Sequence, residues 1–304
     1  MRRIGILGIG GVGGYFGGLL AKAYYKSDDI EIIFIARGET QKIITEDGLK
    51  IVTDESELIV YPKLVSNNPD EIGELDYLIC ATKTYDIEES LLSLKKCIVS
   101  KTVILPLYNG VDAPERIKKI FPENEVLQGC VYIVSMILSP GTIRKIGFYE
   151  KLFFGSNTAP DSKLEELQNI LIKAKIESYI AENIEETVWE KFIFISALAS
   201  ATSYLNENIG QILENKKSKA LYKELLNEIE AVAKAKGLKL PEDIVVQTIA
   251  KLKKSPKDAT SSMHRDLLAG RKIEATSLTQ FVVNEGLKYG VQIPLYQKIA
   301  AALL

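Results

Sequence analysis

Short apolar segments alternate with amphipathic segments over the first 183 residues of the chain. Runs rich in Ile, Val, Leu and Tyr occur at Arg3–Gly8, Ile30–Ala36, Tyr77–Ala81, Thr102–Leu107 and Val126–Met136. Several of these runs are apolar throughout, which is typical of parallel strands that helices cover on both faces. Segments long enough for crossover helices lie between them, at Gly11–Tyr25, Asp86–Lys96 and Asp112–Phe121. The pattern predicts an α/β fold with a Rossmann-type, doubly wound sheet.

Two later apolar runs, Lys151–Gly155 and Ile176–Ala181, flank a helical stretch at Ser162–Lys175, and we expect both as additions to the same sheet. After Asn183 only helical spacing remains, with Gly237 and Gly290 placed as helix stops. The helical segments are Glu185–Leu205, Lys217–Lys236, Pro241–Lys253 and Glu274–Tyr289. We therefore predict a Rossmann-like domain over residues 1–183 and an all-α domain over residues 184–304.

Composition narrows the class of protein. A length of 304 residues suits two domains, and a net charge of −2 gives no reason to expect nucleic-acid or anionic-membrane binding. No stretch approaches the roughly 18 apolar residues of a membrane span, and the N-terminus enters the first predicted strand without a cleavage site. Cys80, Cys97 and Cys130 form no disulfide or zinc pattern, and His264 is the single histidine. We expect a cytoplasmic protein without a metal site.

A glycine-rich segment follows the first predicted strand. Gly8-Ile9-Gly10-Gly11-Val12-Gly13 fits G-x-G-x-x-G and opens a predicted helix. In this motif Gly8 permits a tight turn, Gly10 lets the backbone approach a pyrophosphate, and Gly13 lets helix and strand pack closely. Free N–H groups at the helix N-terminus attract the phosphates. Gly17 and Gly18 continue the cluster and predict tight packing of the helix against the sheet. The segment predicts dinucleotide binding.

The end of the second predicted strand bears on which dinucleotide binds. In an NAD site this strand ends in Asp or Glu, which accepts a hydrogen bond from the ribose 2′-OH. Here the strand ends in Arg37, and a guanidinium can bind a 2′-phosphate with two charge-assisted hydrogen bonds. Glu39, two residues later, is the alternative candidate for the carboxylate role. We predict NADPH/NADP⁺ as the cofactor.

An ordered set of motifs resembles the ketopantoate reductases (2-dehydropantoate 2-reductases). The set consists of Gly8–Gly18, Ala36–Glu39, Ala81–Asp86, Tyr108–Val111, Trp189–Phe192, Ser261–Met263 and Glu274. It spans essentially the whole chain. The resemblance implies NADPH-dependent reduction of the 2-keto acid 2-dehydropantoate to pantoate in pantothenate and coenzyme A biosynthesis. It also implies that residues 1–183 bind NADP and that residues 184–304 bind the substrate and catalyse its reduction.

The resemblance also implies roles for individual residues. Lys191 would be the general acid that protonates the forming alkoxide, and Glu274 would hydrogen-bond the substrate hydroxyl. Ser262 would bind the substrate carboxylate, and Asn208 would retain a further polar contact. Three more residues would contact the cofactor: Asn109, which also reaches the substrate, Lys83 and Ser135.

The residue types suit this chemistry, although each also has a structural explanation. Hydride attack on a ketone develops negative charge on oxygen, which a positioned ammonium stabilises. Lys191 could instead extend from the helix edge into solvent, and Glu274 could stabilise a helix N-terminus. Ser262 could be a helix N-cap, and the Asn109-Gly110 pair is a good turn dipeptide. His264 is the rival acid, but the adjacent Arg265-Asp266 indicates a polar surface network.

The substrate half departs from the family pattern. Ile195, Ala199 and Ala259 stand where the family usually has asparagine. On an α-helix Ser196 and Ser200 lie about 140° and 180° from Lys191, so neither replaces a lost amide. A pocket without these amides should hydrogen-bond a hydroxylated keto acid less well. This predicts either weak turnover of 2-dehydropantoate or a more apolar 2-keto acid as the substrate.

Three hypotheses follow. The first is an NADPH-dependent reductase of 2-dehydropantoate, and the second is a reductase of another small 2-keto acid. The third is an NADP(H)-binding sensor without turnover, which would not need Lys191 and Glu274. The apolar segment Tyr296–Leu304 is either core or a homodimer contact, and core is the commoner outcome.

Overall fold

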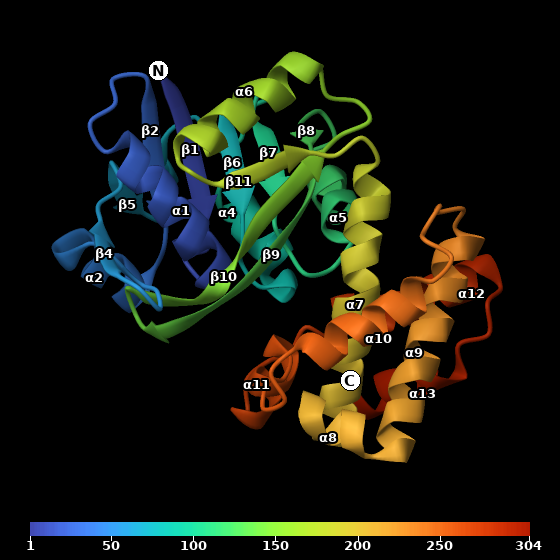
Figure 1. Cartoon of the computed structure of the whole chain (residues 1–304). Helices are drawn as coiled ribbons and strands as arrows, with labels where there is room; N and C mark the ends of the chain where they lie inside the picture. The colour runs from blue at the N-terminus through green and yellow to red at the C-terminus, as the bar shows by residue number, and fades with distance from the viewer. The chain divides into compact units, whose positions relative to one another are not determined.

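The computed structural model describes all residues 1–304 and divides into two compact units (Figure 1). The first unit comprises Met1–Tyr108 and Ala113–Ile184, and the second comprises Asn109–Asp112 and Glu185–Leu304. The predicted fold class is confirmed, because the first unit is α/β with a parallel sheet and the second is helical. The short segment Asn109–Asp112 joins the helical unit although it lies far from the rest of that unit in the sequence.

The first unit contains a six-stranded parallel sheet in the order β5-β2-β1-β6-β7-β8. Its strands are β1 (Arg2–Leu7), β2 (Ile30–Ile35), β5 (Leu64–Ser66), β6 (Tyr77–Cys80), β7 (Val103–Pro106) and β8 (Glu125–Val126). The chain leaves β1 toward β2 on one side and returns to β6 on the other. Such a reversal opens a crevice at the carboxyl ends of the strands, where α/β proteins bind their ligands.

The first unit also contains a second sheet, of five strands. Four of them are in the order β11-β10-β3-β4, and β9 pairs with β10. Its strands are β3 (Leu49–Val52), β4 (Glu57–Val60), β9 (Gln128–Ser139), β10 (Thr142–Gly155) and β11 (Glu177–Ile180). The prediction that Lys151–Gly155 and Ile176–Ala181 extend the first sheet is therefore wrong. The predicted strand Val126–Met136 is also divided between the two sheets. Apolar runs identify strands, but they do not identify which strands pair.

Helix α1 (Gly11–Tyr24) packs against strands of both sheets, and its glycines make this possible. A Cβ atom on Gly17 would lie 3.0 Å from the Ile6 side chain on β1. A Cβ atom on Gly18 would lie only 2.3 Å from the Ile51 side chain on β3. The tight packing predicted for these glycines is confirmed, although half of it is against the sheet that the sequence did not predict.

The remaining helices of the first unit complete the layers. They are α2 (Gly38–Asp47), α3 (Pro69–Ile72), the 3₁₀ turn η1 (Thr84–Asp86), α4 (Ile87–Ser93), α5 (Ala113–Ile120) and α6 (Asp161–Lys173). Helices α4 and α5 bury Ile87, Leu91 and Ile117 on one face of the parallel sheet, and α1 and the second sheet cover the other face. Both faces of the central strands are therefore apolar, as their sequence predicts.

The second unit is built from helices around one core. They are α7 (Ile184–Leu205), α8 (Ile209–Glu214), α9 (Lys216–Ala235), α10 (Ile244–Lys254), α11 (Ser262–Leu268), the π-helical turn η2 (Thr276–Gln280), α12 (Phe281–Tyr289) and α13 (Pro294–Leu303). Gly237 follows α9 with φ +91°, and Gly290 ends α12 with φ +68°, which confirms both predicted helix stops. The predicted helix from Glu274 to Tyr289 differs from the structure, because it begins with the π-helical turn.

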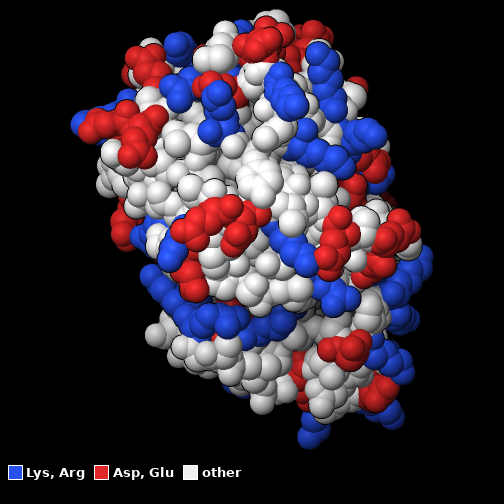
Figure 2. All heavy atoms as spheres, turned by 90° about the vertical axis from the view of Figure 1, so that its left-hand side faces the viewer, with Lys and Arg blue, Asp and Glu red and all other residues white.

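The C-terminal segment contributes to the core of the second unit, since Tyr296 and Ile299 are fully buried. None of the helices combines the length and the apolar character that a membrane span requires. On the face drawn in Figure 2, basic and acidic side chains both occur among uncharged ones, in keeping with the small net charge.

Candidate active site

The turn after β1 depends on two glycines for steric reasons. Gly8 has φ +91°, and a Cβ atom there would lie 2.8 Å from the Thr82 backbone nitrogen. A Cβ atom on Gly13 would lie 2.1 Å from the Gly8 carbonyl oxygen. A Cβ atom on Gly10 would meet nothing within 4 Å. Gly8 and Gly13 thus have the steric roles that the motif predicts, and the backbone at Gly10 is open to a ligand.

The N-terminus of α1 carries no group that competes with an anion. Its N-cap is Gly10, which provides no side-chain hydrogen bond, and its first turn contains no acidic residue. The first N–H groups of the helix and its dipole therefore face the turn with partial positive charge. Such a terminus after a glycine turn is suited to bind a pyrophosphate.

A cavity of about 340 Å³ lies beside this turn. Its walls come from the ends of β1 and β2, from the residue after β5, from the segment after β6 and from α4. The lining residues are Leu7, Gly8, Ile9, Ile35, Ala36, Arg37, Thr40, Asn67, Thr82, Asp86, Glu89, Ser90, Ser93 and Leu94. All of them belong to the first unit. Arg37 lines the cavity and Glu39 does not. Glu39 is therefore not placed to act as the carboxylate that binds a ribose 2′-OH.

These observations fit a dinucleotide. The open backbone at Gly10 and the uncapped helix terminus suit a pyrophosphate, and the cavity beyond them has the size of a small-molecule site. Backbone N–H groups of the segment Gly8–Gly13 would hold the phosphates. The cavity walls would hold one nucleoside.

Two other predicted cofactor residues lie close to this turn but outside the cavity lining. Lys83 precedes η1 after β6. Ser135 lies within β9, with its carbonyl oxygen 2.7 Å from where a Gly11 Cβ atom would be. The Ser135 hydroxyl, which is buried without a hydrogen-bond partner, would lie 3.0 Å from the same Cβ atom.

In the second unit, the structure brings together two of the predicted site residues. The Lys191 ammonium donates a hydrogen bond to the Asn109 side-chain oxygen over 3.1 Å. Lys191 lies on α7 and is 7% exposed, so it is not a lysine that extends into solvent. The amide oxygen of Asn109 thus orients a buried ammonium group.

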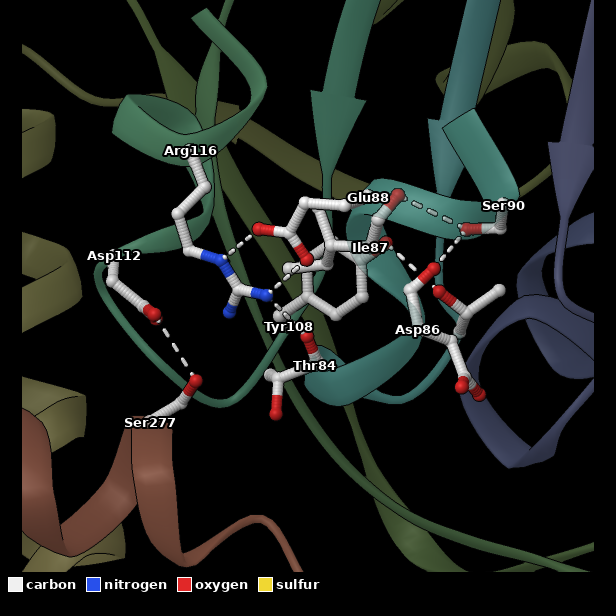
Figure 3. A network of polar contacts seen from close by, with 10 residues as sticks. Thr84, Asp86, Ile87, Glu88, Ser90, Tyr108, Asp112, Arg116 and Ser277 are labelled. Atoms are coloured by element: carbon white, nitrogen blue, oxygen red, sulfur yellow. Dashed lines mark hydrogen bonds and ion pairs between the residues drawn. The ribbon is translucent and has the colours of Figure 1, made fainter. Parts of the chain in front are cut away.

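A second hydrogen bond holds the segment that carries Asn109. The Ser277 hydroxyl, on η2, donates to the Asp112 carboxylate over 3.1 Å (Figure 3). A Cβ atom on Gly110 would lie 2.6 Å from the other Asp112 carboxylate oxygen, so a side chain there would push this carboxylate aside. Our sequence analysis did not predict a role for Asp112 or Ser277. Asp112 and Ser277 are 165 residues apart, so no local sequence motif predicts their hydrogen bond.

Glu274 stands at the start of the same helical segment. Its carbonyl oxygen accepts a hydrogen bond from the Leu278 N–H over 3.0 Å, and the residue is 5% exposed. Glu274 and Ser277 are three residues apart in one turn of helix. The turn that anchors the Asn109 segment therefore also fixes the backbone at Glu274.

Helix α7 is fixed to this turn through buried hydroxyls. Ser196 donates to the Leu278 carbonyl over 2.6 Å, and Ser200 lies 2.9 Å from the Thr279 hydroxyl. Both serines are fully buried. Their hydroxyls are committed to the η2 segment, which supports the expectation that neither replaces an amide beside Lys191.

Ser262 and Asn208, which are predicted to contact the substrate, both lie at helix N-termini. The N-cap of α11 is Ser261, whose hydroxyl accepts the His264 N–H over 3.0 Å. The idea that Ser262 caps this helix is therefore wrong, and Ser262 is its first residue. Asn208 caps α8 in a capping box with Gln211, which occupies its side-chain oxygen.

His264 is buried, so the surface network predicted for it is wrong. Its Nδ1 lies 2.7 Å from the Thr260 hydroxyl, and its Nε2 lies 2.9 Å from the Asn206 side-chain oxygen. Because that oxygen only accepts, Nε2 carries the proton and Nδ1 accepts from Thr260. Burial lowers the pKa of His264. A neutral ring with both nitrogens engaged has a structural role and is a poor general acid.

Two models of one protein family match the sequence of this chain. The family model described as ketopantoate reductase PanE/ApbA matches residues 4–159. The model for the C-terminal part of the same family matches residues 183–304.

Individual relatives match over the full length. A crystal structure of 2-dehydropantoate 2-reductase from Porphyromonas gingivalis W83 is 32% identical, with a TM-score of 0.86 and coverage of 99% of both chains. An uncharacterised oxidoreductase of Bacillus subtilis (strain 168) is 26% identical over 98% of this chain and 96% of its own length. D-mandelate dehydrogenase with NADH and anilino(oxo)acetate has a TM-score of 0.87 over 99% of this chain and 97% of its own. At 20% identity, that last likeness shows the fold alone.

The glycine turn yields a test of stability. We predict that Gly13→Ala lowers the free energy of unfolding by about 2 kcal/mol or more, because a methyl group would collide with backbone that cannot move aside. Gly10→Ala is the matched control and should cost at most about 1 kcal/mol, the penalty for alanine at an N-cap. Denaturant unfolding measures both values. Equal losses in the two variants would contradict the steric account of Gly13.

Proposed function

The chain belongs to the ketopantoate reductase family, and on that premise we propose that it reduces 2-dehydropantoate to pantoate with NADPH. This reaction would serve pantothenate and coenzyme A synthesis. The observation that carries the proposal is the buried Lys191 ammonium held by Asn109, since reduction of a ketone needs a positioned proton donor.

Lys191 performs the proton transfer in this proposal. A bound nicotinamide supplies the hydride for the carbonyl carbon. As the new C–H bond forms, the carbonyl π electrons move to the oxygen, and the Lys191 ammonium stabilises this charge and then gives the oxygen a proton. Asn109 keeps the ammonium oriented through its 3.1 Å hydrogen bond. Water returns a proton to the amine after the reaction.

Three polar residues recognise the substrate in this proposal. The Glu274 carboxylate accepts a hydrogen bond from the substrate hydroxyl, and the Ser262 hydroxyl donates to the substrate carboxylate. Asn208 contributes through its amide N–H groups, because its side-chain oxygen caps α8. Glu274 is 5% exposed, so this hydrogen bond would form largely out of contact with water.

The cofactor contacts proposed for the first unit centre on the glycine turn. Backbone groups from Gly8 to Gly13 hold the pyrophosphate, and Arg37 pairs with the 2′-phosphate. Lys83, Ser135 and Asn109 contact the nicotinamide half. The cavity beside Arg37 supports the adenosine half of this assignment.

A reductase of a more apolar 2-keto acid is the second candidate function. Ala199 is buried and Ile195 is half-buried on α7, so this part of the helix offers no amide to a hydroxylated substrate. A sensor without turnover is less well supported, because it would not need the Lys191–Asn109 pair.

An absorbance assay separates these functions. NADPH oxidation is followed with 2-dehydropantoate and with trimethylpyruvate, which is the same keto acid without its hydroxyl group. The proposal expects kcat/KM to be at least about tenfold higher for 2-dehydropantoate, because the analogue cannot make the hydrogen bond to Glu274. Higher kcat/KM for trimethylpyruvate would support the second candidate. Cofactor binding without oxidation would support the sensor.

Removal of the proton donor tests the mechanism. We predict that Lys191→Ala lowers kcat at least about a hundredfold and leaves the Kd for NADPH almost unchanged, as loss of a general acid should. Lys219→Ala removes the same charge from an exposed position on α9 and should retain activity. Undiminished turnover in Lys191→Ala would remove this lysine from the mechanism.

Cofactor choice tests the proposed role of Arg37. We predict that Arg37→Asp reverses the preference for NADPH over NADH, because a carboxylate repels the 2′-phosphate and accepts from a 2′-OH. The ratio of kcat/KM values for the two cofactors measures this preference. A variant that still prefers NADPH would refute the assignment.

A further inference from the structure

The cavity beside the glycine turn contains a carboxylate opposite Arg37. Arg37 follows β2, and Glu89 lies on α4, so the two side chains come from different walls. The Arg37 Nη1 atom lies 4.0 Å from the Glu89 Oε1 atom, and the two side chains are 78% and 82% exposed. This ion pair spans the part of the cavity where the proposed function places a 2′-phosphate.

The neighbouring acidic residue on α4 is engaged elsewhere. Glu88 accepts two hydrogen bonds from the Arg116 guanidinium, over 2.7 and 2.6 Å (Figure 3). This pairing lowers the pKa of Glu88. Glu88 does not line the cavity, whereas Glu89 does. Glu89 is therefore the α4 carboxylate that a nucleotide in the cavity would meet.

The charges that line the cavity do not favour a 2′-phosphate as strongly as Arg37 alone suggests. The charged lining residues are Arg37, Asp86 and Glu89, which is one cation and two carboxylates. A phosphate monoester carries about 1.5 to 2 negative charges at neutral pH. To bind Arg37 it must compete with Glu89 for the guanidinium and remain near that carboxylate. NADH has no such group and meets neither cost.

We propose that Glu89 is a specificity-determining residue that weakens the preference for NADPH over NADH that Arg37 creates. This inference rests on the proposed function for its choice of cofactor. Glu89 pairs with the guanidinium at 4.0 Å in the free protein and would repel the 2′-phosphate in the complex. Both effects oppose NADPH, and neither opposes NADH. The wild-type protein therefore accepts both cofactors to a measurable degree.

Direct binding measurements with Glu89→Gln test the proposal without any keto acid. Enhancement of reduced-nicotinamide fluorescence gives the Kd of NADPH and of NADH for each protein at low ionic strength. We expect the Kd for NADPH to fall by about two- to fivefold, because an exposed charge pair contributes at most about 1 kcal/mol. The Kd for NADH should stay within about twofold. High salt should reduce the gain, because exposed charges are screened.

Glu39→Gln is the matched control. It removes the same charge two residues from Arg37, but Glu39 is exposed and does not line the cavity. We expect the Kd ratio of the two cofactors to change less than twofold in this variant. Circular dichroism confirms that all variants are folded.

The outcomes separate this inference from the proposed function. A wild-type protein that binds neither nucleotide overturns both. A wild-type protein that binds nucleotide, with the same Kd ratio in Glu89→Gln, overturns only the inference. Weaker NADPH binding in Glu89→Gln also overturns it, because Glu89 would then orient Arg37 for the phosphate instead of competing with it.

Discussion

Helix α1 can pack closely against both sheets because glycines occupy the positions where it approaches their side chains most closely. Gly17 faces Ile6 of the parallel sheet, and Gly18 faces Ile51 of the second sheet. The contact between Gly13 and the Gly8 carbonyl fixes where the helix begins. Because the helix cannot shift, its uncapped N-terminus stays at the reversal point of the parallel sheet. Cofactor binding in this account depends on that fixed, positively polarised terminus.

In the helical unit, a network of hydrogen bonds holds the Lys191 ammonium group in a defined direction. Buried hydroxyls of α7 bond to the η2 segment, and Ser277 on η2 bonds to Asp112. The short segment that ends at Asp112 carries Asn109, whose oxygen accepts from Lys191. Three pieces distant in sequence thus form one polar network. Its individual bonds are modest, and they link Lys191, Ser196, Ser200 and Ser277, which are buried, to Asn109 and Asp112, which are half-buried.

The sequence allowed the local features to be predicted but not the long-range pairings. The glycine turn, the apolar parallel strands and the stops at Gly237 and Gly290 follow from backbone chemistry within a few residues. The second sheet was missed because the hydrophobic pattern of β10 does not say which strand it joins. The burial of His264 was missed because its partners lie on two different loops. Asn206 follows α7, and Thr260 precedes α11. The Asp112–Ser277 bond and the Arg37–Glu89 pair likewise join separate elements, which a single sequence does not reveal.

The central claim is that the glycine turn and the N-terminus of α1 form the cradle of a nicotinamide dinucleotide. A crystal structure of the protein soaked with NADP⁺ tests it most directly. The account predicts pyrophosphate oxygens within hydrogen-bonding distance of backbone N–H groups near Gly10, with the adenosine in the cavity beside Arg37. A nucleotide bound elsewhere on the molecule, with this turn unoccupied, would contradict it.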